Sequence, residues 1–316
     1  MTHFVMKRLF IAIPVLFGIT IFNFFIINLA PGNPAEMYIN PSLSQGDIDM
    51  RMESMGLNDP FWVQYFRWLL AIIQFDFGYS LASYQPVIEV VAERIGPTLL
   101  LMFASLIIAY SIAIPIGVIS AVKQYSWMDY FFTSFSFLGV SIPNFFLGIM
   151  GIFVFALTFQ ILPTGGMYSL GSNQGFGELL KHIILPASVL GTAIAGNMVR
   201  YVRSSILEVL GQDYLRTARA KGLHEWVVIV KHALRNGLIP IITIIGLDIP
   251  VLFGGAVITE QVFQWPGMGQ LMIQSIGSRD YSTLMALNLL IAVVVLSVNT
   301  ITDMLYAVVD PRIKYN

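Results

Sequence analysis

The sequence predicts an all-α integral membrane protein, a single domain over residues 1–316 with six membrane-spanning helices. Three observations lead to this prediction. Hydrophobic residues make up 56% of the chain and charged residues only 11%, whereas soluble domains carry roughly 25% charged residues. The mean hydropathy is +0.75. Six stretches are also apolar over the roughly 20 residues that a helix needs to cross a bilayer.

These six stretches set the expected order of elements. We expect spanning helices at residues 9–30, 98–122, 130–158, 183–202, 238–263 and 281–308. The first follows two basic residues, as a secretory signal does, but its apolar run is too long and no small-residue cleavage site follows it. We therefore expect it to be a retained helix. Pro143 falls inside the third stretch, and Pro240 and Pro250 fall inside the fifth.

Basic residues give the orientation. With six spans both chain ends lie inside, and the outer side holds five of the 17 lysines and arginines: Arg51, Arg67, Arg94, Lys181 and Arg279. The remaining twelve (17 − 5) lie inside, where Lys and Arg are enriched. A seventh span at 60–75 would place the basic loops that follow it on the opposite side of the membrane from Lys7 and Arg8. We therefore expect this segment to be an interfacial or packed external helix, with Trp62, Tyr65 and Trp68 at headgroup level.

Several classes of function are disfavoured. The chain has no cysteine, no G-x-x-x-x-G-K-[ST] phosphate loop, no G-x-S-x-G elbow and no H-E-x-x-H helix. Its four histidines lie on different segments and, by the six-span topology, on both sides of the membrane. No basic tract suggests nucleic acid. We therefore expect no catalytic, metal-binding or cofactor-binding residues in this chain, and no ATP hydrolysis by it.

The long inner segment, 203–237, carries the most specific pattern. Residues 213–223 read DYLRTARAKGL, in which a helix over 215–221 is expected to end at Gly222, because glycine commonly terminates helices. A second helix is expected over 225–234. Small side chains within the first helix would let another surface approach closely. The pattern therefore predicts a docking element for a cytoplasmic partner.

This stretch resembles the cytoplasmic coupling loop of ABC-importer permeases, specifically those of the dipeptide and oligopeptide group. The alanine and glycine of that family's EAA motif match Ala218 and Gly222. Arg216 stands in place of the motif's glutamate, Thr217 in place of its first alanine, and Pro240 lies further downstream than usual; the peptide group shares these departures. By this resemblance the residues that couple to the ATPase are Arg216, Thr217, Ala218, Ala220, Lys221, Gly222 and Leu223.

The resemblance covers essentially the whole chain. Its further motifs, in order, are PGNP at 31–34, GLNDP at 56–60, QYFRW at 64–68, SIPNFF at 141–146, LPTGG at 162–166, His182 with LPA at 185–187, WPGMG at 265–269 and VDPR at 309–312. Each motif is weak alone, and their ordered occurrence along one chain is specific.

The family implies a fold, a location and partners. It implies a type I importer-like permease in the bacterial plasma (inner) membrane, with cytoplasmic termini, a cytoplasmic coupling helix and a long outer segment at 31–97. The implied partners are a second homologous permease subunit, two cytoplasmic ATPase subunits, an extracytoplasmic substrate-binding protein, the peptide substrate and the lipid bilayer. The implied function is ATP-driven import of di- and oligopeptides. Nickel and glutathione permeases are very similar, so the cargo stays open.

Polar residues inside the expected spans are candidates for the translocation path. Asp248 lies in the fifth span, and an intramembrane carboxyl usually faces a bundle interior or a watery cavity. It either contacts polar substrate or serves as a structural group between subunits, and the same two interpretations hold for Asn197 and Asn299. An ion-coupled secondary transporter would show paired broken helices in two matching halves, and no matching half is visible. An intramembrane enzyme would need a nucleophile or metal constellation, which the sequence does not show.

Overall fold

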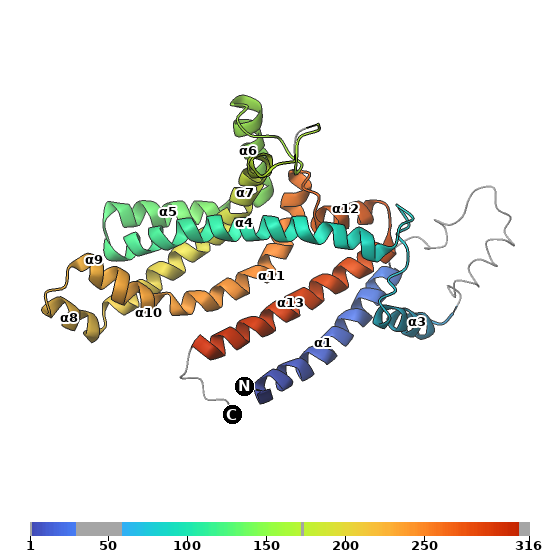
Figure 1. Ribbon diagram of the computed structural model, residues 1–316, viewed down its shortest axis with the longest axis horizontal. Helices are drawn as coiled ribbons and strands as arrows, with labels where there is room; N and C mark the ends of the chain where they lie inside the picture. The colour runs from blue at the N-terminus through green and yellow to red at the C-terminus, as the bar shows by residue number, and fades with distance from the viewer. Residues whose placement is uncertain (1, 30–58, 172–173, 310–316) are drawn as a thin grey trace. The chain divides into compact units, whose positions relative to one another are not determined.

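The computed structural model describes residues 2–29, 59–171 and 174–309. In these residues the regular structure is helical, apart from an isolated bridge between Tyr79 and Pro86 (Figure 1). The all-helical class is therefore confirmed for the described part of the chain. The PGNP motif at 31–34, the first three residues of GLNDP and the residues after 309 lie outside it.

Among the described residues, five helices are long and apolar enough to cross a membrane: α1 (Thr2–Leu29), α4 (Val87–Val122), α7 (Phe176–Leu210), α11 (Ile239–Val262) and α13 (Tyr281–Val309). A sixth candidate is a bent pair. It joins α5 (Trp127–Ser141) to α6 (Asn144–Gly151), which continues as the π-helix η2 (Ile152–Thr158). The apolar centres of these helices coincide with the six expected ranges.

The third expected range, 130–158, is not one straight helix. The chain bends by 99° between α5 and α6, where Ile142 and Pro143 adopt extended backbone angles. Proline has no N–H to continue a helix, and its ring disfavours helical angles in the residue before it. Pro143 therefore ends α5, and itself becomes the N-cap of α6.

Two of the helices extend well beyond the expected ranges. α4 has 36 residues and begins at Val87, so Pro97 lies inside it, and α7 has 35 residues. At 1.5 Å per residue each helix is roughly 50 Å long, against a hydrocarbon thickness of about 30 Å. Hydropathy marks only the part of a helix that sits in hydrocarbon, whereas the backbone hydrogen bonds continue past it.

The chain divides into two compact units, of which the first comprises Met1–Gly96 and Gln270–Ser297. Within it the short helix α3 (Phe61–Ile73) packs on α1. Tyr65 is fully buried, and its hydroxyl lies 2.9 Å from Oγ1 of Thr20. The ring of Tyr65 packs against Phe17 and Phe24 of α1, whereas Trp62 is exposed and Trp68 is half-buried. The position of these three side chains at headgroup level stays a prediction.

A polar contact joins α1 to α13 in the same unit. Asn23 is buried, and its Nδ2 donates to the backbone carbonyl of Met285 at 3.1 Å. Nδ2 of Asn288 donates in turn to Oδ1 of Asn23 at 3.0 Å. Since an unpaired amide in an apolar interior is costly, this pair fixes the register of the two helices.

The second unit comprises Pro97–Gly269 and Val298–Asn316. Its central element is α7, which contacts α5, α6 and α11. The core around α7 is formed by the buried residues Ala113, Ala121, Met198, Val199, Val202, Ile206 and Ile241. Glycine permits close approach between α5 and α7, because a Cβ on Gly196 would lie 2.6 Å from the carbonyl oxygen of Ser136 on α5.

Candidate functional site

The segment singled out in the sequence forms a helical hairpin, residues 213–237. It consists of α8 (Asp213–Ala220), α9 (Glu225–Val227), the π-helix η3 (Val228–Leu234) and α10 (Arg235–Gly237). In Figure 1 these elements lie together at the C-terminal end of α7. The second arm is thus one continuous helical stretch.

Gly222 ends the first arm of the hairpin. It has a φ of +76°, a conformation that glycine adopts without the Cβ penalty of other residues. Its N–H donates to the carbonyl of Arg219 at 2.9 Å, and the N–H of Leu223 donates to the carbonyl of Ala218 at 3.4 Å. These two bonds are those of a Schellman motif, so Gly222 reverses the chain between the two arms.

The two arms share a small core. Its buried residues are Leu215, Ala218, Val228 and Ala233, and Val209 and Leu210 at the end of α7 pack against it. Ala218 therefore faces the second arm, and its small size lets the two arms approach each other. The sequence assigned Ala218 to the docking surface; the structure places it inside the hairpin.

Exposed polar contacts join the two arms of the hairpin. Arg219 donates from Nε and Nη2 to the two carboxylate oxygens of Glu225, at 3.1 and 2.8 Å. The hydrogen bonds from Arg219 lower the pKa of Glu225 below its usual value. Nδ2 of Asn236 also donates to the hydroxyl of Tyr214 at 3.0 Å. Both contacts link the first arm to the second.

The outward face of the hairpin combines charge with apolar groups. The side chain of Arg216 is 75% exposed, and Thr217, Ala220 and Lys221 are exposed as well. Leu223 and Trp226 are also exposed; Trp226 is 68% accessible. Sequence reasoning did not select Trp226, although a tryptophan just after a docking motif is a signal, because Trp is enriched at binding hot spots.

The hairpin is fixed to α7 at a second place. The hydroxyl of Ser205 donates to the carbonyl of Gly237 at 2.7 Å. A Cβ on Gly237 would lie 2.5 Å from Cδ1 of Ile206. A larger residue at position 237 would therefore require the Ile206 side chain to move.

The candidate path residues do not form one cluster. Asp248 is half-buried on α11 and accepts a hydrogen bond from the hydroxyl of Tyr110 on α4, at 2.5 Å. Asn197 on α7 accepts from Nη2 of Arg200 at 2.6 Å. Asn299 is half-buried on α13. The three residues thus lie on three different helices, and Tyr110, which sequence reasoning missed, is the partner of Asp248 that only the structure reveals.

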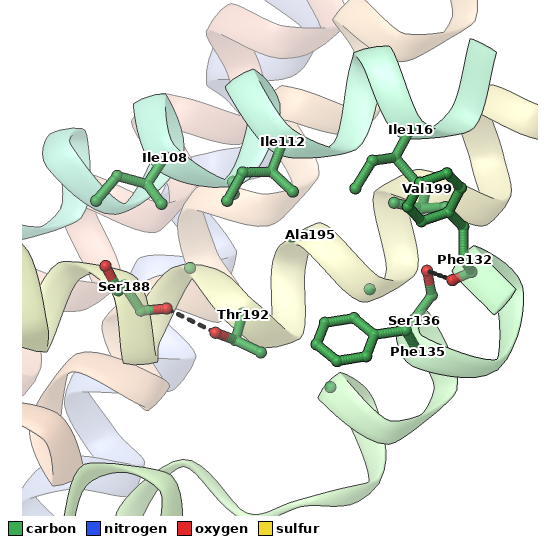
Figure 2. A pocket seen from close by; sticks show the side chains of 14 residues that line it. Ile108, Ile112, Ile116, Phe132, Phe135, Ser136, Ser188, Thr192, Ala195 and Val199 are labelled. Atoms are coloured by element: carbon green, nitrogen blue, oxygen red, sulfur yellow. Dashed lines mark hydrogen bonds between the residues drawn. The ribbon is translucent and has the colours of Figure 1, made fainter. Parts of the chain in front are cut away.

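A pocket of about 160 Å³ lies between α4, α5 and α7 (Figure 2). Its walls include Ile108, Ile112, Ile116, Phe132, Phe135, Ala195 and Val199. Its hydroxyl groups are turned to backbone carbonyls: Ser136 to Phe132, Ser188 to Ile184 and Thr192 to Ser188. Because a polar substrate buried here would lose its hydrogen bonds to water without replacement, this pocket does not suit a peptide backbone.

Two polar clusters brace the opposite end of α7 and the end of α11. Glu260 is fully buried, and its carboxylate accepts from Oγ1 of Thr98 at 2.6 Å and from the N–H of Gly269 at 2.7 Å. Nδ1 of His182 lies 3.1 and 3.0 Å from the carbonyls of Gly165 and Gly166. The LPTGG motif therefore supplies the carbonyl groups near His182, and the WPGMG motif supplies the N–H that Glu260 binds. Among the described residues, no group of three or more potential ligands is placed to hold a metal ion.

The chain is similar to known transport proteins over its whole length. Residues 113–315 match the family "Binding-protein-dependent transport system inner membrane component", and residues 1–102 match the N-terminal domain family of such membrane components. The oligopeptide transport system permease protein AppB of Bacillus subtilis (strain 168) is 47% identical over 316 residues, which is 100% of both chains.

Other relatives carry different cargo names. The dipeptide transport system permease protein DppB of Alkalihalophilus pseudofirmus is 39% identical and matches over 100% of both chains. The glutathione transport system permease protein GsiC of Escherichia coli (strain K12) is 37% identical, also over 100% of both chains. Among solved structures, the inward-facing MetNI methionine ABC transporter aligns with a TM-score of 0.59 at 18% identity, covering 71% of this chain and 98% of that one. That likeness supports the fold.

Proposed function

The chain belongs to the family of binding-protein-dependent transport system inner membrane components, and we propose that it is a permease subunit of an ABC importer for di- and oligopeptides. The observation that carries the proposal is 47% identity to an oligopeptide permease over the full length of both chains. The family is one of transport components, and ATP hydrolysis is assigned to separate partner subunits.

We propose a six-span topology with both termini in the cytoplasm. The bent pair of α5 and α6 with η2 counts as one span in this topology. The helical hairpin then faces the cytoplasm together with most of the basic residues, in agreement with the positive-inside rule. The end of the second unit that holds Glu260 and His182 faces outward.

The proposed complex contains a second permease chain, two ATPase subunits on the hairpin side and a substrate-binding protein on the outer side. The hairpin suits ATPase docking, because its own core and the Schellman turn make it a compact projection while Arg216, Lys221 and Trp226 stay exposed. ATP-driven closure of the ATPases would displace the hairpin and α7 with it, opening the path outward. Hydrolysis would return it inward. In this proposal the chain itself needs no cofactor.

Asp248, Asn197 and Asn299 are the proposed polar contacts along the path. Asp248 is only half-buried despite its bond to Tyr110. An intramembrane carboxyl of this kind usually faces protein or water rather than lipid, which supports a position on the path.

A second cargo is glutathione, itself a tripeptide. Relatives named as glutathione permeases match this chain over its full length at 37–38% identity. That identity is lower than the 47% of the oligopeptide relative, so peptides of other sequences are the first proposal. Nickel is the third cargo, and the reconstitution below separates it from peptide.

The test is a reconstitution in proteoliposomes with the partner subunits and binding protein. We expect peptide-loaded binding protein to stimulate ATP hydrolysis and peptide uptake. Gly222→Asp should abolish both, since it adds a charge and a strained residue to the docking turn. The matched control is Gly171→Asp, because Gly171 has a φ of +77° and, like Gly222, open space around a new Cβ.

Three outcomes separate the parts of the proposal. If glutathione or nickel stimulates and peptide does not, the cargo assignment is wrong and the importer assignment stands. If Gly222→Asp behaves like wild type, the hairpin is not the docking element. If no combination stimulates hydrolysis, the importer function itself is contradicted.

A further inference from the structure

An ion pair links α5 to α7 near the hairpin. Arg203 donates from Nε to Oδ1 of Asp129 at 2.7 Å and from Nη2 to Oδ2 at 2.8 Å. The Asp129 side chain is 3% exposed and that of Arg203 is 25% exposed. Two parallel charge-assisted bonds of this kind are strong and geometrically specific, and burial protects them from the screening that weakens surface pairs.

Asp129 is itself held firmly at the start of α5. Its Oδ2 accepts from the N–H of Tyr125 at 3.0 Å, and its Oδ1 lies 3.3 Å from the hydroxyl of Thr133. Its own N–H donates to the N-cap hydroxyl of Ser126 at 3.3 Å. The carboxylate is therefore fixed to the turn between α4 and α5, so a displacement of Arg203 acts on that turn.

Arg203 is placed next to the attachment of the hairpin. Ser205 and Ile206, which hold Gly237, follow it within one helical turn. Val209 and Leu210, which pack on the hairpin core, follow one turn later. A force applied to the hairpin therefore reaches α7 within two turns of the ion pair.

In the middle of the α5–α7 interface the two helices are held by close glycine packing instead of by an ion pair. A Cβ on Gly196 would lie 2.6 Å from the carbonyl oxygen of Ser136, and a Cβ on Gly139 would lie 3.1 Å from Cγ2 of Thr192. These contacts are close but non-directional, and packed helices of this kind can slide past one another by small shear movements. Directional bonds such as those of Arg203 resist that sliding.

We infer that Asp129 and Arg203 are a positioning pair that makes α5 follow α7 when the ATPases move the hairpin. The inference rests on the proposed importer function. Without the pair, α7 would move with the hairpin while α5 lags, so ATP would be hydrolysed with less transport.

Variants of the pair test the inference in the reconstituted complex. Arg203→Lys keeps the charge but loses the planar two-pronged geometry, and Asp129→Asn keeps the shape but loses the charge. We expect uptake per ATP hydrolysed to fall about fivefold or more, a typical coupling between sites, while binding-protein-stimulated hydrolysis persists. Lys123→Gln, which removes a charge from the same turn without touching the pair, should leave the ratio unchanged.

Because removing one partner of a buried pair can unfold a protein, a double variant supports the test. Asp129→Leu combined with Arg203→Met replaces both charges by apolar groups, which is often neutral for stability. We expect this variant to fold and to be uncoupled. If uptake and hydrolysis fall in parallel in every variant, or if neither changes, the positioning role is overturned.

A distance measurement separates this inference from the importer function. The chain contains no cysteine, so Trp127→Cys and Tyr201→Cys introduce a defined pair of labels at exposed positions on α5 and α7. We expect the distance between spin labels at these positions to stay constant through the ATP cycle in the wild-type background and to vary in Arg203→Lys. Constant distances in both backgrounds overturn the positioning role, and wild-type complexes without uptake contradict the importer function instead.

Discussion

The backbone N–H of Gly269 donates to Oε2 of the buried Glu260 at 2.7 Å, and this bond brings the start of α12 (Met268–Gly277) onto α11. A Cβ on Gly269 would lie 2.4 Å from the Cα of Val257. Glycine is therefore required at this position by close backbone approach, and the requirement can be tested directly.

We expect Gly269→Ala to destabilise the chain, because the new methyl group must push two backbones apart. Overpacking of this kind costs about 1–3 kcal/mol. Thermal unfolding of the purified chain in detergent measures the effect. Gly277→Ala on the same helix is the control, because nothing lies within 4 Å of a Cβ there; equal shifts in the two variants would contradict the argument.

Tyr110→Phe should lower the unfolding free energy by about 1–2 kcal/mol, since it removes the hydrogen bond that Asp248 accepts at 2.5 Å. Asp248→Asn should be milder, because the amide keeps an oxygen that accepts from Tyr110. Thermal unfolding again gives the measurement. Tyr201→Phe removes a hydroxyl at an exposed position and is the control. If it lowers the unfolding free energy as much as Tyr110→Phe does, the hydrogen bond to Asp248 is not the cause.

Trp226→Ala should weaken binding of the ATPase subunit without destabilising the chain. The side chain is exposed in the free chain, and a tryptophan hot spot contributes about 2 kcal/mol or more, or roughly 30-fold in affinity. Titration of the ATPase subunit onto the detergent-solubilised chain measures it. Trp127→Ala removes another exposed tryptophan in the same unit, and affinity lost equally in both variants would show that Trp226 is not special.

The contact between Arg219 and Glu225 should make the hairpin weakly dependent on pH. The pKa of Glu225 is lowered in the folded chain, so the stabilisation is present above its ordinary pKa of 4.5 and is lost as pH falls through the lowered value. Both side chains are about half exposed, which limits the effect to a few tenths of a kcal/mol. Hydrogen exchange of the hairpin amides, measured from pH 6 to 3, should show this loss of protection. Glu225→Gln should remove the part of the pH dependence that comes from the ion pair. If the pH profile is the same in Glu225→Gln as in the wild type, the ion pair is not the cause of the pH dependence.

The helical class is confirmed for the described residues, and the expected apolar ranges fall on helices, because the cost of placing polar groups in hydrocarbon acts on each segment separately. The turn at Gly222, just after the end of α8, was also predictable, since the need for a positive φ is a local property. The same local reasoning missed the true starts of α4 and α7, because a helix continues wherever its backbone bonds continue, and it missed the full effect of Pro143.

The sequence by itself therefore determined the class of the fold, the segments that are apolar enough to cross a bilayer and the place of the hairpin. Tertiary structure alone decided which side chains face each other. Asp129 and Arg203 are 74 positions apart and Thr98 and Glu260 are 162 apart, and no pattern in the chain pairs them. The burial of Tyr65 and Ala218 was likewise decided by tertiary structure, because the burial of a side chain depends on the neighbours that other segments bring to it.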